Sequence, residues 1–417
     1  MQMPSLNLNF GRRSGPDLVG LDIQPGFVAA VQARVNGSVL AERASALPLA
    51  ADTVRDGEVT DVAALSDALR ELFAGSGLSK RVRIGVANQR TVLRTLELPP
   101  VTDRKELAAA VSFQAQDQVP MPLNNAVLDF HPLGVIDTPS GPRQRVVLVA
   151  AQRDMIERLL AAVRGAGLRP EGIDLSAFAL IRSLYRSDPE GASRVLYLNV
   201  DGLTNLAIAE DHVCRFTRVV GSGLEGMASE IAERRGIALT EARELLSAVD
   251  LNAPEEAPSD AGAGVVEDAE PDATTDEQSP EGEPGESPED HEAREREMTY
   301  EEMMSGAQPA AAEQTAATPA PDQDVRAVLE RGIHDIAGEV RNSLDFHRSQ
   351  DGGGEVSRIV LSGSALDLPG FAEALQSHLR VEVHAQTVGL ADDSLTGTVS
   401  THRLAIAAGL AATEIAK

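Results

Sequence analysis

The stretch LVGLDIQPGFVAAVQARVNGSVLAERA, residues 18–44, decides the fold of this chain. An apolar run leads into the turn Gln24-Pro25-Gly26, and a second extended run follows from Phe27 to Arg34. The dipeptide Asn36-Gly37 is typical of a two-residue type I′ hairpin turn and introduces a third run. We therefore expect a three-stranded meander whose first strand carries an acidic residue, Asp22, beside a turn that contains glycine.

The same pattern returns in residues 194–219. Val195 to Val200 predicts a strand and Asp201-Gly202 a turn, and two further extended runs follow. Two copies of strand, acidic turn, strand, hairpin and strand indicate a duplicated architecture. Asp201 thus holds in the second copy the position that Asp22 holds in the first.

Composition narrows the class of protein. The chain has 417 residues, a net charge of −27, 42% hydrophobic residues, 3% aromatic residues and no Trp. This length suggests two or three domains at about 150 residues each. A strongly acidic chain with few aromatic rings repels the phosphate backbone and offers little surface for base stacking, so nucleic acid is not an expected partner. The single cysteine, Cys214, excludes an internal disulfide and fits a reducing compartment.

Most of the acidity lies in one segment, residues 251–324. It holds 22 Asp or Glu against Arg294 and Arg296, together with nine of the 23 prolines. The segment therefore carries −20 of the net charge of −27. A segment with few apolar residues and dense like charge buries too little apolar surface to offset the entropy lost on ordering. We therefore expect a long disordered acidic insert. We interpret the insert as a solvated spacer, with a tether for a partner as the alternative.

No part of the sequence predicts a segment that crosses a membrane. Residues 1–17 contain no long apolar run and predict a flexible arm rather than a secretory signal. The apolar runs Val146 to Ala151 and Leu404 to Ala412 fall short of the roughly 20 residues that cross a bilayer. The second run lacks a basic face, so we expect a helix that closes onto the N-terminal half, with an amphipathic membrane foot as the alternative. A cytoplasmic protein is expected.

Amphipathic helices fill the gaps between the extended runs. A further strand, Val356 to Leu361, leads into Ser362-Gly363-Ser364 and then into a helix. A strand, a turn of small residues and a helix can bring backbone N–H groups and a helix N-terminus to a phosphate or nucleoside. Apolar residues at helical spacing predict the other helices at 103–119, 154–165, 224–236, 240–249 and 325–351.

The two acidic hairpins resemble those of actin, sugar kinases and heat-shock chaperones, in which two hairpins face each other across a cleft that holds the phosphates of ATP. The connecting segments resemble, more specifically, the PilM family of type IV pilus assembly proteins. The resemblance covers about 18–249 and 325–412. The segments that carry it are Leu96–Gly134, Val146–Gln152, Ala166–Asp174, Phe178–Arg182, Glu339–His347 and Leu361–Gly370.

This resemblance implies an α/β fold, the two-lobed actin-like ATPase fold built from duplicated ribonuclease-H-like units. The first lobe would span 18–192 and hold a small inserted α/β subdomain at about 91–168. The second lobe would span 193–412 and contain the acidic disordered insert 251–324. Its closing C-terminal helix would return to the first lobe.

A function is implied as well. Members of the family sit at the cytoplasmic face of the inner membrane, hold the N-terminal peptide of the membrane protein PilN, and couple the pilus platform to assembly motors. An extended peptide in a groove gains affinity from main-chain hydrogen bonds and specificity from side-chain pockets. We therefore expect a scaffold of the type IV pilus platform that docks a PilN-like peptide. It would be peripheral to the membrane through that partner and would contact motor and platform components.

The resemblance also implies that the cleft between the lobes binds ATP with Mg²⁺. Asp22 and Asp201 would hold the metal through water, or each would only satisfy its own turn. Pro25 has no N–H and Phe27 is bulky, so the first turn loses a donor and space. A single glycine, Gly363, replaces a run of three. The predicted nucleotide-site residues are Asp22, Gly26, Asp201, Gly202, Thr204, Gly221, Ser222, Gly223, Gly363 and Ser364.

No catalytic residue is predicted. No residue is placed by motif to orient water, and no arginine to stabilise a transferring phosphoryl group, so ATP hydrolysis is expected to be weak or absent. The eight histidines are scattered, and His378 with His384 does not match the common zinc spacing. No nucleophile elbow surrounds Ser222 or Ser364.

Two alternatives to the scaffold stay open. An FtsA-like cell-division protein of the same superfold would polymerise and carry a membrane helix after the body, for which we expect too little length before Lys417. An ATP-hydrolysing kinase or ATPase of the superfold would need a catalytic carboxylate in the cleft. Its phosphate release would be measurable at about 1 s⁻¹ or faster.

Overall fold

The computed structural model of the protein describes residues 17–187, 194–254, 321–350, 353–392 and 399–412. The expected flexible arm, apart from Asp17, and residues 255–320 of the expected disordered insert lie outside these ranges. Both described edges of the insert are structured, which differs from the prediction. Leu251 N donates to the Pro369 carbonyl at 3.0 Å, and Asp324 lies in helix α7 (Pro321–Ser349) and pairs with Arg234 at 3.6 Å. Contacts with neighbouring elements hold Leu251 and Asp324 in place. The predicted bounds, 251–324, rested on composition alone, which carries no information on such contacts.

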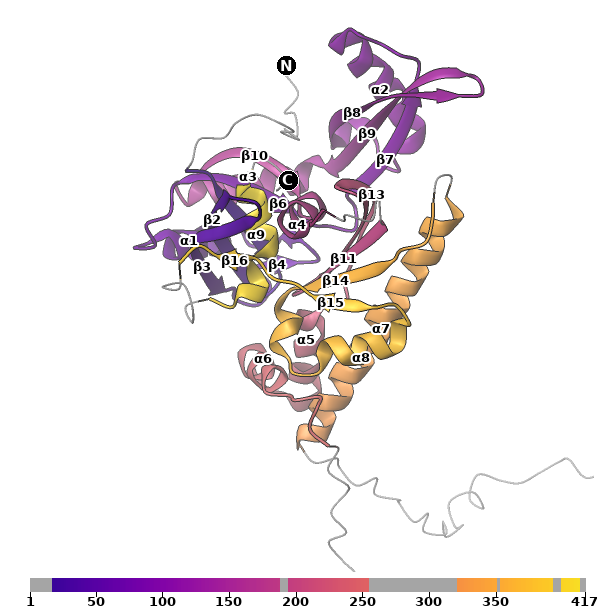
Figure 1. The fold of residues 1–417 in the computed structure, drawn as a ribbon. Helices are drawn as coiled ribbons and strands as arrows, with labels where there is room; N and C mark the ends of the chain where they lie inside the picture. The colour runs from indigo at the N-terminus through magenta and orange to yellow at the C-terminus, as the bar shows by residue number, and fades with distance from the viewer. Residues whose placement is uncertain (1–16, 188–193, 255–320, 351–352, 393–398, 413–417) are drawn as a thin grey trace, which may run out of the picture. The chain divides into compact units, whose positions relative to one another are not determined.

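The first meander forms the centre of a six-stranded sheet with the order β10-β6-β1-β2-β3-β16 (Figure 1). Antiparallel β1 and β2 pair Gln24 with Phe27, so Pro25 and Gly26 form a two-residue turn in which Gly26 has a φ of 88°. β6 runs parallel to β1, and β10 runs parallel to β6. Every residue of β1 is buried, as in a strand covered on both faces. The strands are β1 (Val19–Gln24), β2 (Phe27–Val35), β3 (Val39–Pro48), β6 (Arg81–Val86), β10 (Arg169–Leu175) and β16 (Gly389–Leu390).

The turn between β2 and β3 differs from the predicted type I′ turn. Val35 pairs with Val39, so the loop has three residues, and among them only Gly37 has a positive φ, 66°. A bulge between Gln32 and Ala33 shifts the register of the two strands and so displaces the turn. A three-residue hairpin with glycine in the left-handed conformation is the next most common arrangement.

The second meander forms part of a five-stranded sheet with the order β13-β12-β11-β14-β15. Antiparallel β11 and β12 pair Val200 with Thr204, so the residues from Asp201 to Leu203 form the turn. β14 lies parallel to β11, as β6 lies parallel to β1. This repeated hairpin with a parallel neighbour is the duplication that the sequence predicts. The strands are β11 (Arg194–Val200), β12 (Thr204–Glu210), β13 (Val213–Val220), β14 (Arg358–Ser362) and β15 (Val383–Ala385).

Helices cover the sheets with their apolar faces. Leu329, Ile333 and Val340 of α7, at helical spacing, are all buried in the core of the second sheet. The other helices are α1 (Val62–Phe73), α3 (Arg153–Gly165), α4 (Ser176–Leu184), α5 (Leu224–Arg235), α6 (Leu239–Ser247) and α8 (Phe371–Leu379). Shorter elements are β4 (Val54–Arg55), β5 (Glu58–Val59), and the 3-10 helices η3 (Ser364–Asp367) and η5 (Thr401–Leu404).

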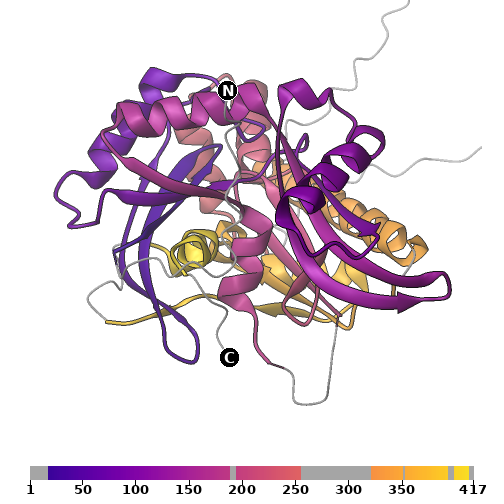
Figure 2. The ribbon, with the colours of Figure 1, turned by 90° about the horizontal axis from the view of Figure 1, so that it is seen from above.

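A small α/β subdomain is inserted between β6 and α3. Its strands lie in the order β7-β9-β8, and α2 covers one face of this sheet around a separate core that includes Leu107, Val111 and Leu148. The long β8–β9 hairpin extends beside α2 (Figure 2). The predicted subdomain extended to about residue 168 and so included α3. In the structure α3 packs on α1 in the core of the first sheet, and the inserted subdomain therefore ends with β9 at Gln152. Its elements are β7 (Val92–Leu98), α2 (Arg104–Gln118), η1 (Leu123–Asn125), β8 (Ala126–Thr138) and β9 (Gly141–Gln152).

The C-terminal helix α9 (Ala405–Ala411) lies against β1, β2 and α4 (Figure 1). The approach is so close that a Cβ on Gly20 would lie 1.9 Å from the Ala407 carbonyl oxygen. The buried Arg83 donates to the carbonyl oxygens of Leu410 at 3.0 Å and Ala412 at 3.1 Å, which satisfies the end of the helix. Late residues therefore complete the first sheet, as β16 also does by pairing with β3. None of the described helices is long and apolar enough to span a bilayer.

Candidate functional site

The ends of β1 and β11 bring the two acidic residues of the repeat together. Asp22 and Asp201 are each only 1% exposed. They lie near enough for the charge of Asp201 to raise the pKa of the Asp22 carboxyl, although 178 residues separate them in the chain. The two hairpins of the repeat therefore meet at their acidic ends.

Asp201 is well supplied with hydrogen-bond donors. Its Oδ1 accepts from the backbone N–H and the hydroxyl of Ser364, both at 2.6 Å, and its Oδ2 accepts from Asn199 Nδ2 at 2.8 Å. Burial raises the pKa of this carboxyl, while the hydrogen bonds from Ser364 and Asn199 and the charge of Arg403 oppose the rise. The turn after β14 thus serves to hold Asp201.

Asp22 has a much poorer environment. Its Oδ1 accepts one hydrogen bond, from Gln24 Nε2 at 3.1 Å, while its Oδ2 and Gln24 Oε1 are buried and have no partner. Burial, and then the charge of Asp201, raise the pKa of Asp22 to about 8, against the smaller effect of the Gln24 hydrogen bond. Asp22 therefore keeps its proton at neutral pH.

The glycines of the predicted site allow backbone to approach backbone. A Cβ on Gly202 would lie 2.0 Å from the Pro25 carbonyl oxygen, so the two acidic turns touch each other directly. A Cβ on Gly223 would lie 2.4 Å from the Gly202 oxygen, and one on Gly363, whose φ is 100°, would lie 2.3 Å from the Val200 oxygen. These glycines are explained by close packing of the chain on itself.

An ion pair stands beside the first turn. A Cβ on Gly26 would lie 2.5 Å from Glu225 Oε2, so the carboxylate of Glu225 occupies the space over the turn. Arg243 Nε donates to Glu225 Oε2 at 2.9 Å, and Arg243 NH1 donates to the Leu49 carbonyl at 3.0 Å. A negative side chain at this position repels a phosphate.

The remaining predicted residues lie on the second turn and on its connection to α5. Thr204 Oγ1 donates to the Ser222 carbonyl at 2.5 Å, so the hydroxyl is already used within the chain. Gly221, Ser222 and Gly223 precede α5, whose first turn has no side-chain cap. All ten predicted residues thus lie on the two facing turns and the segments packed against them.

The described arrangement does not fit MgATP. The cavity that adjoins the turns measures about 110 Å³, whereas small-molecule sites usually measure about 300–1,000 Å³. Its walls include Glu225 and Arg243, and Arg403 lies 5.1 Å from the centre of the Phe27 ring. Among the described residues no cluster of three His, Cys, Asp or Glu side chains could hold a metal. The MgATP site stays a prediction that this closed geometry does not support.

Sequence reasoning missed the side chains that close the site. Gln24 lies two positions after Asp22 on β1, and Asn199 lies two positions before Asp201, which directly follows β11. In extended chain this spacing places the two side chains of each pair on the same face. That signal was available in the sequence. Glu225 and Arg243 carry no such signal, because they reach the first turn from helices of the second half.

Two sheets that each carry an acidic hairpin, with the hairpins meeting at their ends, define an actin-like fold and confirm the fold class expected from the sequence. The chain belongs to the family described as type IV pilus assembly protein PilM, whose profile matches residues 20–256. Family membership also confirms the resemblance drawn from the sequence.

The chain is also similar to several solved structures. A PilM-PilN type IV pilus biogenesis complex is similar with a TM-score of 0.66 at 19% identity, over 95% of this chain and 97% of that chain. The ethanolamine utilization protein EutJ from Carboxydothermus hydrogenoformans has a TM-score of 0.46 at 13% identity, over 98% and 93% of the two chains. MreB 5 of Spiroplasma citri bound to AMPPNP has a TM-score of 0.45 at 11% identity, over 94% of each chain.

Proposed function

We propose that this protein is a cytoplasmic scaffold of the type IV pilus assembly platform that docks the N-terminal peptide of a PilN-like membrane protein. The proposal rests on membership of the PilM family and on a fold similar to that of a PilM-PilN complex. The protein would lie at the inner membrane through this partner, and it would contact further platform and motor components through the same assembly.

The main observation in favour of a scaffold over an enzyme is that the space around the two acidic turns is closed. Asp22 and Asp201 are 1% exposed, and the Glu225 carboxylate lies over Gly26. Hydrolysis of ATP needs a cradle of free N–H donors and room for a metal nucleotide. Here the turns contact each other, so we propose docking without nucleotide turnover.

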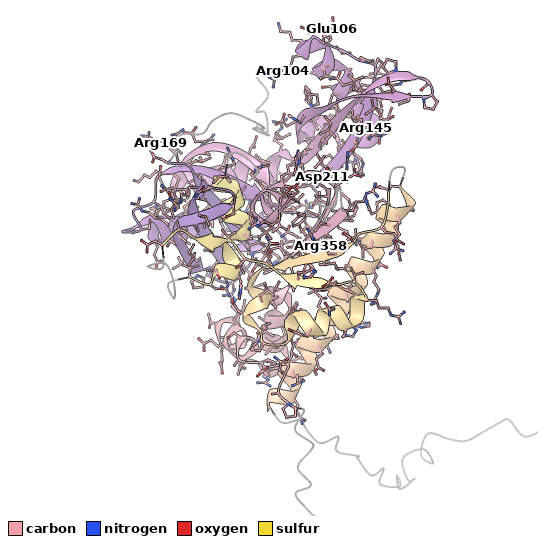
Figure 3. The ribbon with its side chains drawn as sticks, viewed as in Figure 1. Arg104, Glu106, Arg145, Arg169, Asp211 and Arg358 are labelled. Carbon is pink, nitrogen blue, oxygen red and sulfur yellow. The ribbon has the colours of Figure 1, made fainter. Side chains whose placement is uncertain are left out.

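The inserted subdomain supports the docking part of the proposal. Its sheet ends in the strands β7 and β8, and such edges can add an extended peptide through main-chain hydrogen bonds. Phe113 on α2 and Val135 on β8 present large apolar side chains that are 70% and 58% exposed. Arg104 and Glu106 lie at the start of α2 (Figure 3). The subdomain thus combines sheet edges, apolar side chains and charges of both signs.

Calorimetric titration of the full chain tests the proposal. We expect saturable heat with the synthetic N-terminal peptide of the PilN-like partner and none with a scrambled peptide. We expect no heat with MgATP and no phosphate release. Turnover above about 1 s⁻¹ would replace the scaffold with an ATPase. Absence of peptide binding, with a folded protein, would remove the docking function.

A further inference from the structure

The end of α7 lies along β13, which is an edge strand of the five-stranded sheet (Figure 1). Arg218 on this strand pairs with Glu339 of the helix at 2.6 Å. Two turns further along the helix, the ring centre of Phe216 lies 5.9 Å from that of Phe346 and 6.2 Å from that of His347. Among the described strands β13 pairs with β12 alone, so its contacts with the end of α7 help to hold this edge.

His347 is buried at the end of this contact without a hydrogen bond to its ring. The residue is 4% exposed. Neither Nδ1 nor Nε2 has a partner among the residues that the structure describes. A neutral imidazole carries one N–H donor and one acceptor nitrogen, so both tautomers leave two polar atoms unsatisfied. Burying such atoms costs free energy, and a hydrocarbon ring at this position would avoid that cost.

The charges around His347 oppose a proton on its ring. Arg194 on β11 contributes a positive charge and Glu210 on β12 a negative one. The carboxylate of Glu210 already pairs with two guanidinium groups, that of Arg194 at 3.1 Å and that of Arg215 on β13 at 2.8 Å. Glu210 therefore offers little compensation for a third cation.

Burial, and then the charge of Arg194, lower the pKa of His347 below its ordinary 6.5, against the smaller effect of Glu210. On α7 itself the nearest charges, Asp345 and Arg348, are exposed and pair with each other at 3.4 Å. His347 is therefore neutral at pH 7 while the helix is packed. A histidine in water, by contrast, takes up a proton as pH falls through about 6.5.

We infer that His347 is a pH-sensitive switch: proton uptake on its ring, which has no acceptor in its buried position, moves the side chain into water and releases the last turn of α7 from β13. Release separates the rings of Phe216 and Phe346 and frees this edge of the sheet. Only the released form holds the proton between the two pKa values, so release becomes more favourable as pH falls. The inference is independent of the proposed function, because it concerns contacts within the chain alone.

Amide hydrogen exchange of the full chain at pH 7.5 and pH 5.5 tests the switch, after correction for the effect of pH on the chemical exchange rate. In the wild type we expect protection of residues 343–349 and 213–218 to fall by up to about tenfold at pH 5.5, because a released histidine becomes protonated over this range. His347→Phe keeps a ring that cannot titrate, so its protection should be equal at the two pH values. His334→Phe removes an exposed histidine from the same helix and should behave as the wild type.

Measurements on the wild type keep the test independent of how well a variant folds. Unchanged protection of both segments at pH 5.5, or an equal loss across both large sheets, would overturn the inference, because the release is local. His347→Met supplies a second side chain that does not titrate, in case the larger ring of phenylalanine fits poorly. A loss of protection at pH 5.5 in both His347 variants as large as in the wild type would assign the acid sensitivity to other groups and overturn the switch.

Discussion

Asp22 and Asp201 are both buried, yet only Asp201 is surrounded by donors. Three hydrogen bonds favour the charged form of Asp201, whereas Asp22 has one and faces the charge of Asp201. Of the two carboxyl groups, Asp22 is therefore the one that keeps its proton near neutral pH. This arrangement links the stability of the protein to pH.

We predict that Asp22→Asn stabilises the protein at pH 8 and not at pH 4. Asp22 has a pKa of about 8 when folded, and an ordinary aspartate in the unfolded chain titrates near 3.8. Between these values only the folded state holds the proton, so the free energy of unfolding of the wild type falls as pH rises from about 4 to 8. Asparagine is a neutral substitute that does not titrate. Urea unfolding at several pH values measures the difference.

Asp201→Asn is the control for that experiment. An amide at this position would turn an N–H₂ group toward the Ser364 or Asn199 donors, so we expect lower stability at every pH. A pH-independent gain from Asp22→Asn would contradict a raised pKa and would point to packing alone.

Cys214 gives a second prediction for a single residue. The thiol is 8% exposed, and burial raises its pKa to about 12. The thiolate is the reactive form of cysteine, so the native protein should not react with Ellman's reagent at pH 8. One thiol per chain should react after urea denaturation. Rapid reaction of the native protein would show that β13 opens readily around this residue.

Among the elements, α5 and α6 place one ion pair against the opposite hairpin. Glu225 comes from α5 and Arg243 from α6, and together they reach Gly26 and the Leu49 carbonyl of the first half. Their side chains are only 18% and 21% exposed, so solvent screens the pair weakly. The pair links the two halves at the acidic turns.

We predict that Arg243→Ala lowers the free energy of unfolding by about 2 kcal/mol, because it leaves the Glu225 carboxylate partly buried without its partner. The double variant Arg243→Ala with Glu225→Ala should recover part of this loss. Arg55→Ala, which breaks an exposed pair with Asp52, should cause no measurable change in urea unfolding. A loss in the double variant equal to the sum of the losses in Arg243→Ala and Glu225→Ala alone would argue against coupling between the two residues.

The sequence predicts the repeated elements well because their signals are local. Strand alternation, the Asp201-Gly202 turn and the helical spacing of α7 each depend on residues close together in the chain. The type I′ turn at Asn36 was wrong because a bulge between Gln32 and Ala33 changes the register at a distance from the turn. A register shift of this kind has no clear local signature.

The candidate site is less predictable for a related reason. Asp22, Asp201 and Ser364 come together as expected, because hairpins and parallel strands bring them to one place. The closure by Glu225 and Arg243 depends on how two halves of the chain pack. The sequence near Gly26 therefore contains no local signal for its contact with Glu225.

At the scale of the whole molecule, helix α9 covers strands of the first sheet, which lie far from it in the sequence. α9 packs on β1 and α4, and Arg182 NH1 donates to the Gly409 carbonyl at 2.7 Å. A Cβ on Gly409 would lie 1.9 Å from the Ala179 carbonyl oxygen. Glycine at this position, as at Gly20, is therefore needed for the close approach of two backbones.

We predict that Gly20→Ala destabilises the protein by about 3 kcal/mol or more, since its methyl group would collide with the Ala407 backbone, which cannot move without displacing α9. Thermal unfolding and protease resistance of α9 measure the effect. Gly338→Ala on α7 is the matched control. Its methyl group would meet only Arg341, at 3.9 Å, so it should stabilise the helix by about 0.5–1 kcal/mol. A neutral Gly20→Ala would mean that α9 packs more loosely on β1.

The position of α9 also affects how this protein is made. During synthesis, β1 and β2 leave the ribosome hundreds of residues before the helix that covers them is translated. Until then the apolar surface of those strands is open to water and to other nascent chains. The N-terminal half can complete its assembly only after α9 has been translated, so a chaperone that shields those strands would improve the yield.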